Sequence, residues 1–245
     1  MVYAWLFCSQ ASFSYAAQAG TQTEKASSAT NIESAQGSTV YRAGLKSIVV
    51  PPPADLRETG PDYRVLFEHD APDSNRLLAA FLPSEDIAKL PARPEGGLVH
   101  YALLETLRQA EFVEIDEATF KQIKEAVAKQ FGSSADAPTV DLKAFQDEVN
   151  HKLKAEGGTA GVSLDKPVML GTFFSKPSAL GTGMMMSVGA GGTTKKVIVG
   201  TAVLRTQNRL LYASVFAQYT GDDSLTWVRT ISEQWADAIL KANSQ

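Results

Sequence analysis

The densest group of reactive side chains in the 245-residue sequence lies between positions 69 and 74. His69, Asp70, Asp73 and Ser74 supply an imidazole, two carboxylates and a hydroxyl. Such groups act as general acid, general base or nucleophile when they converge on one substrate. Their spacing matches no metal-binding or catalytic-triad motif. We therefore favour a turn whose Asp, Pro and Ser residues satisfy its own backbone, with catalysis by His69 and Asp70 or Asp73 as the alternative.

The other two histidines are poorly placed to share chemistry with a partner. His100 precedes Glu105 by five residues, so on a strand the two side chains face opposite ways. On a helix they would be about 140° apart. His151 projects away from the apolar stripe of its predicted helix. We expect His100 to be a satisfied or surface residue and His151 to be exposed to solvent.

Met184, Met185 and Met186 carry thioethers, which favour Cu(I). Only two of the three sulfurs would share one face of a strand, so packing in the core is the favoured interpretation. The glycines around them fit neither a phosphate loop, since Thr194 precedes Lys195 where that loop needs Gly, nor the dinucleotide fingerprint. A hairpin turn is the favoured interpretation of these glycines. They are Gly181, Gly183, Gly189, Gly191 and Gly192.

Metal and covalent chemistry have little support elsewhere in the sequence. Asp222 and Asp223 lack the alternating oxygen donors of a calcium loop, and one of them or Ser224 is expected to cap a helix. Cys8 is the only cysteine, which excludes disulfides and zinc-thiolate sites from the rest of the chain. The G-x-S-x-G motif of serine hydrolases and the H-E-x-x-H motif of zinc proteases are absent. The sequence therefore predicts no cofactor and no metal.

The charge of the chain argues against nucleic acid as a partner. Lys and Arg number 23 against 27 Asp and Glu, which gives a formal net charge of -4. No block of like charges is longer than the pair Lys195 and Lys196. A nucleic-acid or polybasic membrane surface needs more cations than this. An unknown protein or a small-molecule ligand is the expected partner.

The first 19 residues resemble a secretory signal. An apolar run from Val2 to Cys8 is followed by Ala17-Gln18-Ala19, a small-x-small cleavage pattern. We expect export to the periplasm or the medium. A lipid anchor at Cys8 and an untidy tail of a cytoplasmic protein are the alternatives, because no Lys or Arg precedes the apolar run. No later stretch approaches the roughly 18 apolar residues of a membrane-spanning helix.

The remaining chain divides into a leader and one domain. Residues 20–46 are predicted to be a flexible leader, since residues 20–38 hold few large apolar side chains. Residues 47–245 are predicted to form a single α+β domain. In its first half we expect strands over residues 48–50, 75–82 and 98–109, where a helix is the alternative for the last. Helices are expected over residues 62–68, 117–131 and 140–155, and a short helical turn is expected to begin at Ser84. Ser84 should cap that turn, and Asp116 should cap the helix over residues 117–131.

The second half predicts an antiparallel meander packed against helices. Four β-rich runs, over residues 168–174, 180–188, 195–206 and 209–219, are separated by Gly, Pro and Asn. Gln207-Asn208 should form a tight hairpin turn, because Asn tolerates the left-handed conformation. A long C-terminal helix, capped by Asp222, Asp223 or Ser224 and extending through Ala242, must cover one face of the sheet. Its buried face should hold Leu225, Val228, Ile231, Trp235 and Ile239.

This order of elements resembles the Mog1/PsbP-like α+β sandwich. The resemblance covers about residues 47–243 and includes the strand ended by Pro51-Pro52-Pro53, the Gln207-Asn208 hairpin and the helix with Trp227 and Trp235. The same outline is similar to small exported bacterial proteins of unassigned function. The resemblance implies a binding or accessory role and carries over no functional residue.

The sequence thus favours an exported, non-enzymatic binding or accessory protein of the cell envelope. This expectation rests on the signal-like first 19 residues and on the lack of a recognisable set of catalytic residues in the sequence. A hydrolase-type enzyme using His69, Asp70 and Asp73 is the first alternative. An envelope structural protein that acts as an oligomer is the second.

Overall fold

The computed structural model describes residues 37–68, 73–90, 98–132, 146–147, 150–151, 162–190 and 193–244. The main sheet consists of β3 (Arg57–Glu58), β4 (Asn75–Leu82), β5 (His100–Leu107), β6 (Val162–Leu164), β7 (Val168–Lys176), β8 (Ala179–Ala190), β9 (Thr193–Thr206) and β10 (Arg209–Gln218). A separate hairpin is made by β1 (Thr39–Ala43) and β2 (Lys46–Val50). The helices in these ranges include α3 (Pro61–Glu68), α4 (Ser84–Lys89), α5 (Glu117–Gly132) and α7 (Asp222–Ala242).

The eight strands of the main sheet lie in the order β3-β4-β5-β10-β9-β8-β6, and β7 also pairs with β8. Every pairing is antiparallel. The last four strands follow one another as neighbours, with Gln207 and Asn208 at φ angles of 50° and 57° in the turn between β9 and β10. This confirms the α+β class, the meander and its hairpin turn. The 98–109 segment is the strand β5, because it pairs with both β4 and β10.

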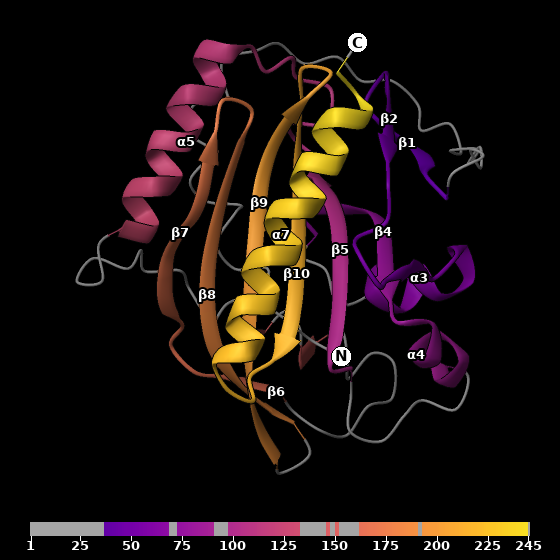
Figure 1. Cartoon of the computed structure of the whole chain (residues 1–245), viewed down its shortest axis with the longest axis vertical. Helices are drawn as coiled ribbons and strands as arrows, with labels where there is room; N and C mark the ends of the chain where they lie inside the picture. Colours follow the sequence, from indigo (N-terminus) through magenta and orange to yellow (C-terminus); the bar gives the residue numbers. More distant parts are fainter. Residues whose placement is uncertain are drawn as a thin grey trace.

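Helix α7 covers one face of the sheet and lies diagonally over β9 and β10 (Figure 1). Its buried side includes the expected Val228, Ile231, Trp235 and Ile239, while Leu225 is half-buried. The helix comes close to β9 at Gly200, where a Cβ atom would lie 2.8 Å from Val228 Cγ1. A glycine at this position therefore permits the tight packing between helix and sheet.

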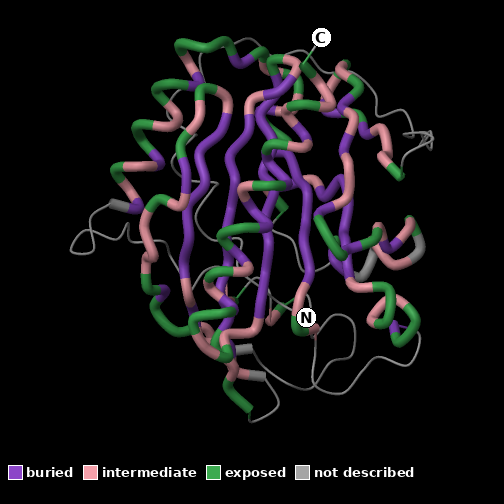
Figure 2. The backbone as a smooth tube through the Cα atoms, viewed as in Figure 1, coloured by how far each residue is buried: buried purple, intermediate pink, exposed green. Residues whose placement is uncertain are grey.

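The other face is covered by helices from the first half of the chain. Phe67 of α3 and the α5 residues Val127 and Phe131 belong to a core cluster with Leu103 of β5 and Phe216 of β10. Because helices cover both faces, nine of the ten residues of β10 are buried. Figure 2 shows this as continuous burial along the central strands, whereas the helices are buried on one side. The sheet is thus the middle layer between helices.

The first strand of the structure, β1, lies before the predicted start of the domain at residue 47. Residues 39–46 were assigned to a flexible leader, but Thr39–Ala43 form β1 and pair with β2. Tyr41 of β1 and Ile48 of β2 are buried in the same core cluster as Trp235. The strand was missed because its apolar residues are few and its partner surface comes from the far end of the chain.

Two of the expected helix caps are wrong. Pro83 and not Ser84 precedes α4, and Gly221 at φ 144° precedes α7; neither helix start has a side-chain cap. Asp222 and Asp223 lie in the first turn of α7, where their negative charges interact favourably with the helix dipole. By contrast, Asp116 caps α5 as expected, since its Oδ1 accepts the Thr119 N–H at 2.7 Å.

Several expectations concern residues outside the described ranges. The signal-like segment over residues 1–19, Cys8, and most of the predicted 140–155 helix fall there. None of the helices in the described ranges combines the length and apolar character needed to cross a membrane.

Candidate functional site

The predicted catalytic cluster is described only in part. His69 and Asp70 lie outside the described residues, and Asp73 is exposed in the turn that precedes β4. Ser74 Oγ donates a hydrogen bond to Asn75 Oδ1 at 2.9 Å, as expected of a turn that uses its own polar side chains. Asp73 and Ser74 thus lie in a turn, and the catalytic hypothesis stays a prediction.

His100 packs against an aromatic ring at the start of β5. Its imidazole stacks on the Trp227 indole of α7, with ring centroids 4.3 Å apart and an interplanar angle of 28°. Burial lowers the pKa of His100, and the carboxylate of Asp86 offsets this in part. His100 is therefore a half-buried residue packed against an aromatic ring. His151 is exposed, which confirms the second expectation.

The methionines and their neighbouring glycines are packing residues. Met184 and Met186 are 4% and 2% exposed, and Met185 lies in a cluster on the other face of the sheet. Gly181 and Gly183 lie within β8 and not in a hairpin turn. A Cβ atom at these two positions would collide with the rings of Phe174 and Phe173, respectively. In the described ranges no three His, Cys, Asp or Glu side chains are grouped to hold a metal ion.

The polar groups that the structure does bring together lie at one end of the sheet, next to the C-terminus (Figure 1). The β1–β2 turn, the loop after β5 and the β9–β10 turn meet there. Gly44 N–H donates to Glu111 Oε1 at 3.1 Å, which joins the first two segments. Ile115 N–H donates to the Asn208 carbonyl at 2.9 Å, which joins the loop to the third. Backbone and side-chain bonds thus hold the three segments as one surface.

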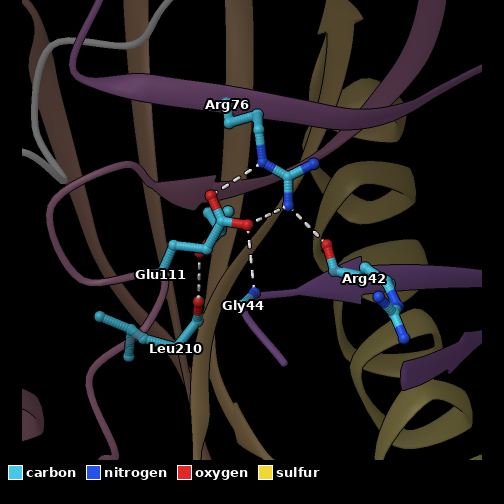
Figure 3. A network of polar contacts seen from close by, with 6 residues as sticks. Arg42, Gly44, Arg76, Glu111 and Leu210 are labelled. Carbon is cyan, nitrogen blue, oxygen red and sulfur yellow. Dashed lines mark hydrogen bonds and ion pairs between the residues drawn. The ribbon is translucent and has the colours of Figure 1, made fainter. Parts of the chain in front are cut away.

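Arg76 and Glu111 fix the β1–β2 hairpin to this end of the sheet (Figure 3). Arg76 Nε donates to Glu111 Oε2 at 2.9 Å, and Arg76 Nη2 donates to Glu111 Oε1 and to the Arg42 carbonyl. Paired charges in this two-pronged geometry are strong and directional. The negative charge of the Glu111 carboxylate is therefore balanced by the guanidinium of Arg76.

Asn243, at the end of α7, joins the C-terminus to β2. Its Oδ1 accepts the Val49 N–H at 2.9 Å, and its Nδ2 donates to the carbonyls of Val49 and Ile239 at 2.7 Å each. Gln207 Nε2 in turn donates to the Asn243 carbonyl at 3.1 Å. The helix end, the hairpin and the β9–β10 turn are consequently tied together by side-chain amides.

These segments surround an open pocket of about 280 Å³, which we call the cationic pocket. Its described lining residues are Lys46, Arg205, Gln207, Asn208 and Asn243. They supply two permanent cations and three amides, and no carboxylate. Such a lining suits an anion, because guanidinium and ammonium groups form strong charge-assisted hydrogen bonds to carboxylate or phosphate oxygens.

The two cations are held differently. Arg205 is fixed, since its Nε donates to the Ile115 carbonyl at 2.8 Å and its Nη2 to Asn208 Oδ1 at 3.2 Å. Lys46 is half-buried at the start of β2, and its ammonium has no hydrogen bond or ion pair within the described residues. A cation without a partner among the described residues is available to form charge-assisted hydrogen bonds with an anion from outside.

Asp116 is an acidic group within electrostatic reach of Arg205. Hydrogen bonds from Thr119 hold the pKa of Asp116 below its ordinary value, and the Arg205 charge lowers it further. The carboxylate of Asp116 is already used to cap α5 and does not line the pocket.

The sequence analysis missed all five described lining residues as site residues. They come from the start of β2, the end of β9, the turn after it and the end of α7. Each is ordinary in its local context, where Gln207 and Asn208 indicate only a turn. No local signal marks Lys46 as a partner of Arg205, because their proximity depends on the docking of the hairpin.

Comparisons with known proteins give no assignment. No family model matches the sequence, and no curated protein matches it. Among solved structures, the chain is similar to a mutant of protein Mog1, with 14% identity over 83% of this chain and 90% of that chain at a TM-score of 0.28. It is also similar to the Ran-binding protein Mog1p of Saccharomyces cerevisiae, with 13% identity over 80% and 84% of the two chains at a TM-score of 0.26. Likeness at these values assigns no function and no residue.

Proposed function

We propose that this protein is a binding protein that holds an anionic group of its ligand or partner in the cationic pocket. The observation that carries the proposal is that Lys46, a half-buried residue, lines the pocket together with Arg205 and has no described counter-charge. A bound carboxylate or phosphate would supply the missing interaction. Hydrogen bonds to charged groups contribute about 1.5–3 kcal/mol each.

The size of the pocket fits a ligand that carries an anion on a larger body. A water molecule occupies about 30 Å³ of liquid, so 280 Å³ exceeds what one carboxylate fills. The amides of Gln207 and Asn208 line the additional space and can donate or accept hydrogen bonds. The pocket therefore suits recognition of an acidic group together with the polar atoms next to it.

Binding is favoured over hydrolysis by the chemistry of the described lining. General acid–base or nucleophilic catalysis requires groups such as His, Asp, Glu, Ser or Cys in contact with the substrate. The lining residues in the described ranges include none of these. The hydrolase hypothesis with His69, Asp70 and Asp73 gains no support from the described residues.

Export to the cell envelope is the second part of the proposal. It is supported by the apolar run and the Ala17-Gln18-Ala19 pattern of the sequence. Expression of the full chain in a bacterium, followed by fractionation and N-terminal sequencing, tests it. We expect a periplasmic or secreted protein that begins at Gly20. A cytoplasmic protein that keeps residue 1 would contradict export without affecting the proposed pocket.

The pocket is tested by titrating the full chain with citrate and with inorganic phosphate in a calorimeter at low ionic strength. We expect binding of at least one of the two anions, and a loss of about tenfold or more in Lys46→Glu, because like charge then faces the anion. The fold should be unaffected, since the Lys46 ammonium has no described partner.

Lys166→Glu is the matched control. Lys166 is exposed between β6 and β7 at the opposite end of the sheet, so this variant has the same change in net charge. Equal affinity of the Lys46→Glu and Lys166→Glu variants, or no binding of either anion, would refute the proposed site.

A further inference from the structure

Exposed apolar side chains lie beside the cationic pocket. The large hydrophobic residues exposed in the described ranges are Leu45, Val99, Phe112 and Val168. Leu45, 69% exposed, lies in the β1–β2 turn directly before Lys46, and Phe112, 54% exposed, follows Glu111 in the loop after β5. Both residues belong to the segments that meet at the end of the sheet where the cationic pocket lies. Exposed apolar groups next to a polar recognition site are typical of a protein-binding surface.

Gly44 brings the two exposed residues together. Its φ angle is 58°, and a Cβ atom at this position would collide with the Glu111 carbonyl and lie 3.3 Å from Phe112 Cα. The glycine therefore lets the β1–β2 turn touch the backbone of the loop. Because Leu45 follows Gly44 and Phe112 follows Glu111, the two exposed apolar residues come from backbone segments that touch each other.

Hydrogen bonds and an ion pair within the protein hold the segments of this surface together. The Gly44 N–H bond to Glu111 and the Arg76–Glu111 ion pair fix the hairpin against the loop (Figure 3). The bonds of Arg205 to Ile115 and Asn208 fix the loop against the β9–β10 turn. A pre-organised surface loses little conformational entropy on binding.

We propose that this end of the molecule docks an acidic segment of a partner protein that also carries large apolar side chains. The inference rests on the proposed anion-binding function and names its ligand class. A carboxylate of the segment occupies the cationic pocket, while its apolar side chains cover Leu45 and Phe112. Charge complementarity selects the acidic segment, because Lys46 and Arg205 line the pocket and the exposed Arg42 lies on the same hairpin.

Two other occupants fit the observations less well. A second copy of the chain docked through the same surface would place the Lys46 and Arg205 cations of both copies together, which costs energy. An anionic membrane is disfavoured by the net charge of -4 and by the small number of cations at this end. Both are outcomes that the experiment separates from the proposal.

The test uses three fluorescein-labelled peptides and the full chain in fluorescence anisotropy. The first peptide is Glu-Asp-Leu-Phe-Glu-Asp, the second replaces Leu-Phe by Ser-Ser, and the third replaces the acids by Lys. We expect binding in the order first, second, third, with about a tenfold preference for the first over the second, from partial burial of the apolar side chains. Equal affinity of the first two peptides would overturn the proposal.

Variants then locate the docking surface. The double variant Leu45→Ser and Phe112→Ser should lose the preference for the first peptide but still bind citrate or phosphate as the wild type does. The double variant Val99→Ser and Val168→Ser is the matched control, since these exposed residues precede β5 and begin β7 at the other end of the sheet. It should keep the preference.

Each failure has its own signature. Loss of anion binding in Lys46→Glu together with an unchanged peptide preference in the Leu45/Phe112 double variant refutes this inference and leaves the proposed function intact. Unchanged anion binding in Lys46→Glu refutes the function itself. Sedimentation with phosphatidylglycerol vesicles that depends on Leu45 and Phe112, without peptide binding, would identify a membrane and overturn the proposal. Concentration-dependent dimerisation lost in the same double variant would do so in favour of a second copy.

Discussion

Glu105 is an acidic side chain enclosed completely by the core. It lies on β5, is 0% exposed, and neither carboxyl oxygen has a hydrogen-bond partner. Burial raises the pKa of Glu105 well above its ordinary value of 4.5, and the nearby Asn75 amide lowers it only in part without reaching hydrogen-bond geometry. The sequence analysis considered Glu105 only in relation to His100. A buried carboxyl of this kind is favoured in its neutral form.

The neutral form of Glu105 has a consequence for stability. Because its folded pKa lies above the unfolded value, the contribution of Glu105 to stability is most favourable below about pH 4.5 and is lost as the pH rises toward the folded pKa. The loss is about 1.4 kcal/mol per pH unit. We expect Glu105→Gln to remove this loss and to be more stable than the wild type at pH 7. Urea unfolding at a series of pH values measures the difference between the two proteins.

Glu114→Gln is the control for this experiment. Glu114 is exposed, and substitutions at such positions change stability by about 0.5 kcal/mol or less. If the difference in unfolding free energy between wild type and Glu105→Gln does not change with pH, Glu105 is not held neutral in the folded protein.

Among the elements, α7 organises the most distant parts of the chain. Trp235 is 1% exposed and packs edge-on against Phe81 of β4, with ring centroids 5.3 Å apart. Its Nε1 donates to the Pro51 carbonyl at 2.8 Å, directly after β2. Asn243 holds Val49 of the same strand. One helix thus packs on the main sheet and holds the β1–β2 hairpin in place.

We expect Trp235→Phe to destabilise the protein by about 1–3 kcal/mol, because the part-buried Pro51 carbonyl loses its donor. Thermal or chemical unfolding measures this. Trp227→Phe is the matched control, since Trp227 is half-buried, and we expect a smaller loss. Equal losses in the two variants would show that the Trp235 hydrogen bond contributes nothing specific.

In the molecule as a whole, the central strands are held by more neighbouring elements than the β1–β2 hairpin is. Strands β9 and β10 are paired along both edges and buried on both faces. The hairpin is a two-stranded sheet, held by the side chains of Trp235, Asn243, Arg76 and Glu111. Two-stranded hairpins have little stability of their own.

This difference predicts the order of local opening. In hydrogen exchange followed by mass spectrometry, peptides of β9 and β10 should exchange only through global unfolding, whereas peptides of β1 and β2 should exchange earlier. Asn243→Ala should speed exchange in β2 and leave β10 unchanged. Exchange in β2 as slow as in β10 would mean that the hairpin opens only together with the sheet.

Local patterns in the sequence determined most of the elements. The spacing of Val228, Ile231, Trp235 and Ile239 predicted the buried side of α7, and Gln207-Asn208 predicted the turn between β9 and β10. These features depend on residues within a few positions of one another. The exact strand limits of β4 followed from its apolar run and from Pro83.

The tertiary structure alone decided the β1–β2 hairpin and the cationic pocket. Residues 49 and 243, which are 194 positions apart, meet only because α7 crosses the sheet in one direction and the hairpin docks against its end. Lys46 and Arg205 line one pocket for the same reason. A local pattern records which face of an element is apolar, but not which distant polar groups the buried faces bring together when they pack.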